Sequence, residues 1–186
     1  YWETFYRYKR LQGGFIWDWI DQGLRQYTDD GREHFAYGGD FGDEPNDKQM
    51  CINGLLFPDG TPSPSLAEYK KVLQPVHIEA GNLTMRKVKL TNRYDFLSLE
   101  HLHISWSIEA DGALLQSGTM TTPKNMKPGN SRTLVIPFKP PAPLLAGTDY
   151  WLNISLTLAA DTTWGKQGQQ VAWAQFELPL KTPKPA

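Results

Sequence analysis

Apolar and polar positions alternate with period two through most of the second half of the chain. One stretch carries its apolar side chains on one face, at Leu102, Ile104, Trp106 and Ile108. The same alternation returns at residues 150–158 and 172–178. Together with residues 85–91, 114–121 and 132–138, it predicts about seven short antiparallel strands in roughly 110 residues. This spacing is typical of an immunoglobulin-like β-sandwich.

The first part of the chain has a different pattern. Its central feature is a nearly continuous apolar run, Phe15-Ile16-Trp17-Asp18-Trp19-Ile20, which predicts a strand covered on both faces. Residues 27–32 predict a hairpin turn in which Gly31 adopts a positive φ. A long loop rich in glycine and aspartate follows at residues 38–47, and loops of this length in compact domains usually carry function. We therefore expect a structured loop at the mouth of an active site.

Two helices are expected in this part. The first covers residues 2–11 and is stopped by Gly13-Gly14. The second opens at residues 63–66, with Ser65 and Glu68 as a capping box, and ends at Pro75. One strand and two helices cannot close a sheet, and a segment of this size buries too little to offset its chain entropy. The chain thus divides into residues 1–75 and 76–186, and we expect the natural context of the first part to be larger.

Composition and charge exclude two classes of protein. The net charge is −1 and no long basic block occurs, which argues against a nucleic-acid-binding protein. No apolar stretch approaches the roughly 20 residues of a membrane span. The single cysteine, Cys51, allows no disulfide within the chain and fits a cytoplasmic location.

The candidate chemistry is incomplete. Trp17-Asp18-Trp19 and Asp21 offer an indole platform for a sugar with carboxylates nearby, although core packing is the more common role of a lone tryptophan. The four histidines have no metal-ligand spacing, and the loop at residues 38–47 lacks the order of a calcium loop. No glutamate ends a strand-like run, whereas glycoside hydrolysis needs a pair of carboxylates. The chain alone therefore carries no complete catalytic apparatus.

Several motifs resemble one family. The stretches that carry the resemblance are residues 11–22, 37–47, 53–55 and 61–64, and the Asp111-Gly112 turn and Ala172-Trp173 also fit. They resemble the lac-type bacterial β-galactosidases of glycoside hydrolase family two. The resemblance implies a mainly β chain: an immunoglobulin-like β-sandwich, preceded by the C-terminal strand and helix portion of a (β/α)8 TIM barrel. In such barrels the active site lies at the C-terminal ends of the strands.

The resemblance also implies roles for three residues. Trp17 corresponds to a tryptophan that forms an apolar wall for the galactose ring. Asn53 corresponds to an asparagine whose side-chain oxygen binds sodium beside the sugar. Met50 stands where the family typically has a phenylalanine whose backbone carbonyl binds the same sodium. The magnesium ligands and both catalytic glutamates would lie outside this chain, so the isolated chain is expected to be inactive.

For the complete enzyme, the resemblance implies hydrolysis of terminal β-D-galactosides such as lactose with retention, and a homo-oligomer. Two alternatives come from the residues. Residues 76–186 could form a stand-alone carbohydrate-binding module that uses Trp106, Trp151 or Trp173. The sandwich could also be purely structural, as a spacer or an oligomer contact, because the fold alone does not determine function.

Overall fold

The computed structural model describes residues 1–184 and divides the chain into two compact units, Tyr1–Leu73 and Gln74–Ala186. Each unit is described by itself.

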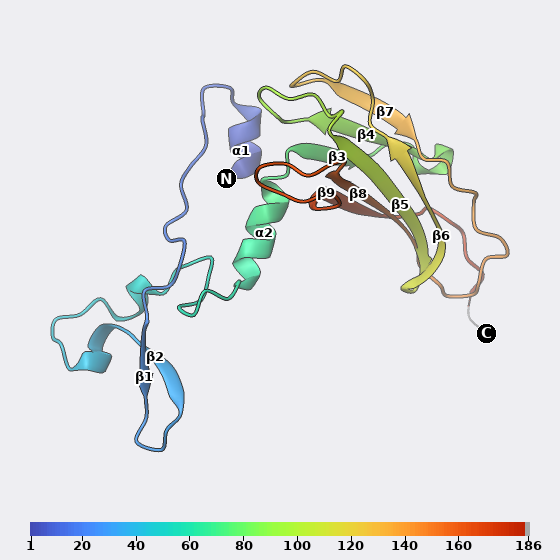
Figure 1. Cartoon of the computed structure of the whole chain (residues 1–186). Coiled ribbons are helices and arrows are strands. Elements are labelled where there is room, and N and C mark those ends of the chain that lie inside the picture. Colours follow the sequence, from blue (N-terminus) through green and yellow to red (C-terminus); the bar gives the residue numbers. More distant parts are fainter. Residues whose placement is uncertain (185–186) are drawn as a thin grey trace. The chain divides into compact units, whose positions relative to one another are not determined.

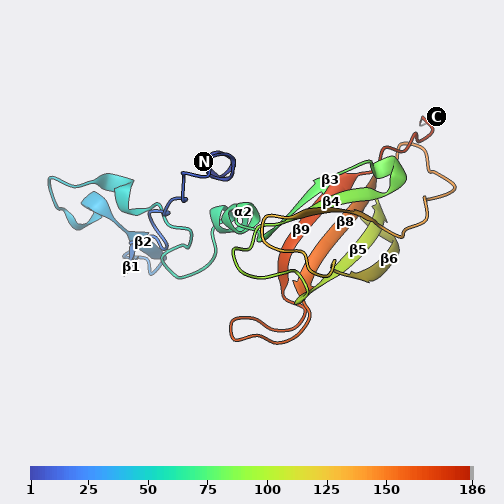
Figure 2. The ribbon, with the colours of Figure 1, turned by 90° about the horizontal axis from the view of Figure 1, so that it is seen from above.

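The second unit is a sandwich of two antiparallel sheets (Figures 1 and 2). One sheet has the strand order β3-β4-β7 and the other β6-β5-β8-β9. The strands are β3 Val76–Ala80, β4 Lys87–Asn92, β5 Leu102–Ala110, β6 Ala113–Thr121, β7 Ser131–Val135, β8 Tyr150–Leu158 and β9 Gln170–Glu177. The predicted sandwich and its antiparallel strands are therefore confirmed.

The period-two pattern determines which side chains form the core. In β5 every second residue from Leu102 is buried, and β8 shows the same alternation from Tyr150. The two strands pair in register, so that Trp106 lies opposite Ile154. The core takes side chains from both sheets, including Val76, Val88, Leu90, Ile104, Ile108, Leu152 and Leu156, all at most 1% exposed. Burial of apolar area on this scale is the main stabilising term of a small domain.

Two predicted strands of this unit have different ends. The strand predicted at residues 85–91 begins only at Lys87, because Leu83–Met85 forms a 3-10 turn that Arg86 closes with φ 58°. The strand predicted at residues 132–138 ends at Val135. Ile136 and Phe138 are still buried in the core, so their apolar character reports burial rather than strand pairing.

The first unit has little regular structure. It contains helix α1 Trp2–Arg7, the hairpin strands β1 Leu24–Tyr27 and β2 Glu33–Ala36, two 3-10 helices and helix α2 Pro64–Val72. The predicted hairpin is confirmed, and Gly31 has φ 81° as expected. The first helix is shorter than predicted, because the chain is already extended at Tyr8 (ψ 108°).

The second helix begins earlier than predicted. Ser63 is its N-cap residue and Pro64 occupies the first turn, where the missing N–H of proline is harmless. The expected capping box of Ser65 and Glu68 is therefore wrong, because both residues already lie inside the helix.

The strand predicted at residues 15–20 is absent. A strand needs a neighbouring ladder, and in the described part of the chain this segment forms only one isolated bridge, from Ile20 to Leu56. Its side chains are also uncovered: Phe15 is fully exposed and Trp17 is 79% exposed. The apolar run is thus present without the two covering layers that the pattern predicts.

Candidate functional site

The segments that contain Trp17 and Asn53 lie side by side in the first unit. The Asp18 N–H donates to the Asn53 carbonyl at 3.2 Å, and the Leu55 N–H donates back to the Asp18 carbonyl at 3.1 Å. Further along, the Leu56 N–H donates to the Trp19 carbonyl at 3.0 Å. Two motifs more than 30 residues apart in the sequence are therefore joined through their backbones.

Asp21 and Gly54 stabilise the pairing of the Trp17 and Asn53 segments. Asp21 is one of the few buried polar residues, and its Oδ1 accepts the Gly54 N–H at 2.7 Å. A Cβ atom on Gly54 would lie 2.2 Å from the Asp21 backbone nitrogen, so only glycine allows the two segments to approach this closely. Sequence reasoning assigned the Asp21 carboxylate to a ligand, whereas the structure assigns it to the backbone of the neighbouring segment.

Asn53 and Met50 are brought together by a local turn. The Asn53 Nδ2 donates to the Met50 carbonyl at 3.0 Å. Met50 lies in the 3-10 helix Lys48–Cys51, and its side chain is 70% exposed. A carbonyl oxygen has two lone pairs, so the Met50 oxygen keeps acceptor capacity beyond this bond. The turn therefore places two neutral oxygen donors, the Met50 carbonyl and the Asn53 side-chain carbonyl, on adjacent groups.

Trp17 and Asp18 have contrasting environments. The Trp17 indole is largely exposed, so no core of this unit surrounds it. The Asp18 carboxylate is tied down, because it accepts the Trp19 N–H at 2.5 Å and the Gln22 side-chain N–H at 2.6 Å. Both partners are local, which fixes the chain directly after the exposed indole.

The glycine-rich loop is structured, as predicted. Gly38–Phe41 forms a 3-10 helix whose first turn is held by the Asp40 carboxylate, which accepts the Tyr37 N–H at 2.9 Å. A Cβ atom on Gly38 would lie 2.6 Å from the Lys48 carbonyl oxygen, so the loop folds tightly onto the segment that precedes Met50. The loop therefore supports the turn that carries Met50 and Asn53.

Within residues 1–184, no group of three or more histidine, cysteine, aspartate or glutamate side chains could hold a metal ion. No helix in the described part of the chain is long and apolar enough to span a membrane.

Comparison with known families assigns both parts of the chain. Residues 1–78 match the model of the "Glycosyl hydrolases family 2, TIM barrel domain", and residues 88–179 match "Beta-galactosidase, domain 4". These matches define the class: the chain belongs to family 2 of the glycosyl hydrolases. Within that family, the two parts of the chain are similar to the C-terminal end of the barrel domain and to domain 4 of β-galactosidases.

Curated relatives agree with this assignment. The β-galactosidases of Klebsiella pneumoniae and Priestia megaterium are each 40% identical over 186 residues, which is 100% of this chain and 18% of each relative. The β-galactosidase of Pectobacterium atrosepticum is 39% identical over 180 residues, or 97% of this chain and 17% of the relative. The chain therefore spans less than a fifth of the length of these relatives. The resemblance noted in the sequence is confirmed.

Sequence reasoning missed the positioning roles of Asp21 and Gly54. The signal that could have identified them is their place in two motifs, WDWxDQ and NGL, that resemble the same family. A buried aspartate and a glycine that has no room for a side chain indicate that two backbone segments approach closely. The sequence alone does not say which two segments these are.

Proposed function

We propose that this chain acts within a larger β-galactosidase that hydrolyses terminal β-D-galactosides of the lactose type with retention of configuration. Residues 1–75 would serve in the catalytic barrel and residues 76–186 as the following sandwich domain. The observation that carries the proposal is the backbone pairing of the Trp17 and Asn53 segments, which unites the two residues proposed to bind sugar and sodium.

Trp17 is the proposed wall for the galactose ring. Indole faces stack on the C–H face of sugars, and the Trp17 indole is accessible for such a contact. Asp18 would hold the chain next to the indole, because its carboxylate accepts hydrogen bonds from the Trp19 backbone N–H and the Gln22 side chain. Trp17 therefore contributes binding surface and no proton transfer.

Asn53 and Met50 are the proposed sodium ligands of this chain. Hard cations prefer oxygen donors, and these residues offer an amide oxygen and a backbone carbonyl on adjacent groups. When bound, sodium would supply a Lewis-acidic partner for a sugar hydroxyl. Replacing the family's phenylalanine by Met50 preserves the carbonyl ligand. The family resemblance implies that magnesium would be held by residues outside this chain.

Retention requires an acid/base carboxylate and a nucleophilic carboxylate about 5–5.5 Å apart. We place both outside residues 1–186, so the isolated chain should have no hydrolytic activity. Its partners would be the remaining domains of the same polypeptide, a galactoside and further copies in a homo-oligomer. The lone Cys51 is consistent with a cytoplasmic location.

The test uses the complete polypeptide that carries these residues and an aryl β-galactoside as substrate. Asn53→Ala should raise the sodium concentration needed for half-maximal activity at least tenfold, and Trp17→Ala should raise KM by about tenfold. Met50→Phe restores the family residue and should leave the sodium dependence unchanged. Proton NMR of the first product should show β-galactose.

Two results would contradict the proposal. Unchanged sodium dependence in Asn53→Ala would show that Asn53 is not a sodium ligand. α-Galactose as the first product would exclude retention. Trp164→Ala, an exposed tryptophan in the second unit, is the matched control for Trp17→Ala and should leave KM unchanged.

A further inference from the structure

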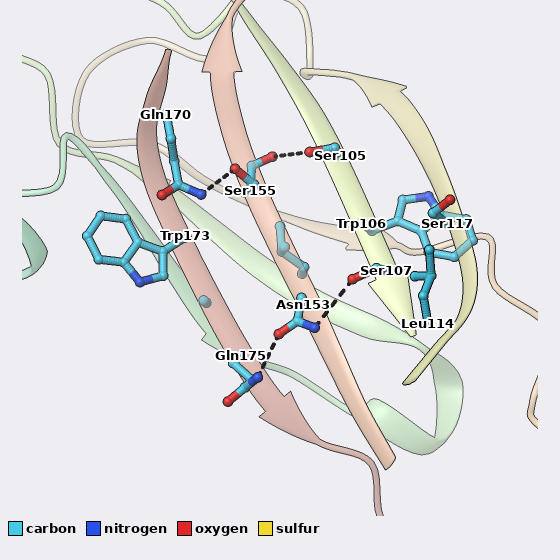
Figure 3. Close-up of a pocket in the computed structure, with 12 residues that line it drawn as sticks. Ser105, Trp106, Ser107, Leu114, Ser117, Asn153, Ser155, Gln170, Trp173 and Gln175 are labelled. Carbon is cyan, nitrogen blue, oxygen red and sulfur yellow. Dashed lines mark hydrogen bonds between the residues drawn. The ribbon is translucent and has the colours of Figure 1, made fainter. Parts of the chain in front are cut away.

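The outer face of the four-stranded sheet in the second unit carries a set of uncharged polar side chains (Figure 3). The strand register aligns them in two neighbouring rows across the sheet. The first row is Ser117, Ser107, Asn153 and Gln175, and the second row is Thr119, Ser105, Ser155 and Trp173. We call these eight residues the polar face.

Hydrogen bonds between the side chains hold the polar face in place. Gln175 Nε2 donates to Asn153 Oδ1 at 2.8 Å, and Asn153 Nδ2 donates to Ser107 Oγ at 3.3 Å (Figure 3). Near the second row, Gln170 Nε2 donates to Ser155 Oγ at 2.7 Å. Amide groups carry two donors and an acceptor with two lone pairs, so Asn153 and Gln175 keep capacity for a ligand. A face that is already ordered loses little entropy on binding.

Trp173 adds an aromatic surface to this face. Its side chain lies on β9 between those of Gln170 and Gln175, and the residue is half-buried (Figure 3). Its backbone N–H donates to Gln74 Oε1 at 3.2 Å, and Gln74 is 6% exposed. The backbone of β9 at Trp173 is therefore held by a buried side chain.

The polar face is hollowed in two adjoining places. One hollow of about 660 Å³ is lined by Ser107, Asn153, Trp173 and Gln175, and a second of about 470 Å³ is lined by His103, Thr119 and Thr157. Ser105 lines both. Their volumes fall in the range of roughly 300–1,000 Å³ that is usual for ligand sites. Neither lining contains aspartate, glutamate, lysine or arginine.

We propose that the polar face binds a neutral oligosaccharide. Hydroxyl and amide groups can both donate to and accept from sugar hydroxyls, and the Trp173 indole suits the C–H face of a ring. A lining without aspartate, glutamate, lysine or arginine favours an uncharged ligand, because an ionic ligand would lose its hydration without gaining a strong opposite charge. Two adjoining hollows fit more than one sugar unit. This site lies wholly in the second unit and does not depend on Trp17 or Asn53.

The experiment is an NMR titration of the isotope-labelled chain, residues 1–186, with lactose, neutral β-linked galactotetraose and tetragalacturonate. Galactotetraose should shift the side-chain amide signals of Asn153 and Gln175 and the indole signal of Trp173, with a Kd in the range of about 0.1–10 mM. It should bind more tightly than lactose, and tetragalacturonate should not bind.

Variants assign the binding to these side chains. Trp173→Ala and Gln175→Ala should each weaken galactotetraose binding by about tenfold. Trp173→Tyr keeps an aromatic surface and should retain most of the affinity, which separates loss of the platform from loss of folding. Trp164→Ala is the matched control outside both hollows and should bind as the unaltered chain does.

Four results would overturn the proposal. They are the absence of shifts at millimolar galactotetraose, equal binding of tetragalacturonate, full affinity in Trp173→Ala, and polar-face shifts that follow protein concentration without sugar. The last result would identify a second copy of the chain as the occupant. A titration abolished by Trp17→Ala but not by Trp173→Ala would place the sugar in the first unit and leave the proposed galactosidase role intact.

Discussion

The two units of this chain are stabilised by different means. The second unit has one continuous core, in which Leu152, Leu156 and their neighbours are completely buried. In the first unit, Ala36 and Leu55 are the only hydrophobic residues classed as buried among those described. Many large apolar side chains of that unit are exposed, among them Phe15, Ile16, Trp17, Trp19, Leu24 and Phe41.

The first unit shows that a specific backbone geometry can form without a hydrophobic core around it. The first unit places Trp17 beside the Asn53 segment through backbone hydrogen bonds and the close approach at Gly54. Hydrogen bonds contribute only about 1 kcal/mol each, so such a unit opens easily. Apolar surface on this scale normally marks an interaction site, which agrees with a role inside a larger barrel.

Hydrogen exchange should show the largest contrast. In the isolated chain, the amides of Leu152 and Ile154 should exchange at least about a thousandfold more slowly than those of Asp18 and Leu55, because they open only with the whole sandwich. Exchange resolved by NMR or mass spectrometry measures the difference. Equally slow exchange in both units would show that the first unit folds as cooperatively as the second.

A cavity in the sandwich core should have the next largest effect. Leu152→Ala removes a fully buried side chain from the central strand β8 and should lower the free energy of unfolding of the second unit by about 2–5 kcal/mol. Urea denaturation measures this change. Leu55→Ala in the first unit is the control, and it should leave the unfolding of the sandwich unchanged. A comparable effect of both substitutions would mean that the two units unfold together.

Gly118→Ala tests close packing on the edge strand β6. A Cβ atom there would lie 2.6 Å from the Trp106 ring, which is itself buried, so the indole must shift. We expect a loss of about 1–3 kcal/mol in unfolding free energy and a change in the near-ultraviolet signal of tryptophan. The neighbouring Thr119→Ala faces outward and should change the stability much less. An unaltered tryptophan signal in Gly118→Ala would contradict this packing.

Tyr94 should produce the smallest effect, and only at alkaline pH. Burial raises the pKa of its hydroxyl above the ordinary value of 10.0, and the hydroxyl lies 3.3 Å from His101 Nε2. The folded state therefore holds the phenolic proton more tightly than the unfolded state. This stability is complete below pH 10.0 and is lost as the pH rises through the folded-state pKa.

Tyr94→Phe should thus flatten the decline of the urea midpoint as the pH rises above 10.0. If the urea midpoint of Tyr94→Phe declined with pH as steeply as that of the unaltered chain, Tyr94 would not contribute to the alkaline loss of stability.

The sandwich could be predicted because the pattern that defines each strand lies within a short stretch of the sequence. Alternation along β5 and β8 identifies the buried face from the sequence alone. The ends of the strands could not be predicted, since they depend on the left-handed conformation of Arg86 and on core contacts of Ile136 that continue beyond the end of β7. Local pattern thus defines the elements, and tertiary structure sets their ends.

The candidate site could be predicted only in part. The motifs around Trp17 and Asn53 are recognisable in the sequence, but their pairing depends on hydrogen bonds between residues about 33 positions apart. The apolar run at residues 15–20 was misleading for a physical reason. It has the composition of a doubly covered strand, while the described chain supplies one isolated bridge at Ile20 and no covering layers.

The contact between Gly54 and Asp21 also matters for protein engineering. Since even a methyl group on Gly54 would meet the neighbouring backbone, a mutagenesis library directed at this segment should hold Gly54 and Asp21 constant. Met50 has an exposed side chain and contributes through its backbone, so it can be fully randomised. Diversity placed at position 50 would change the surface beside Asn53 while the frame that supports it stays intact.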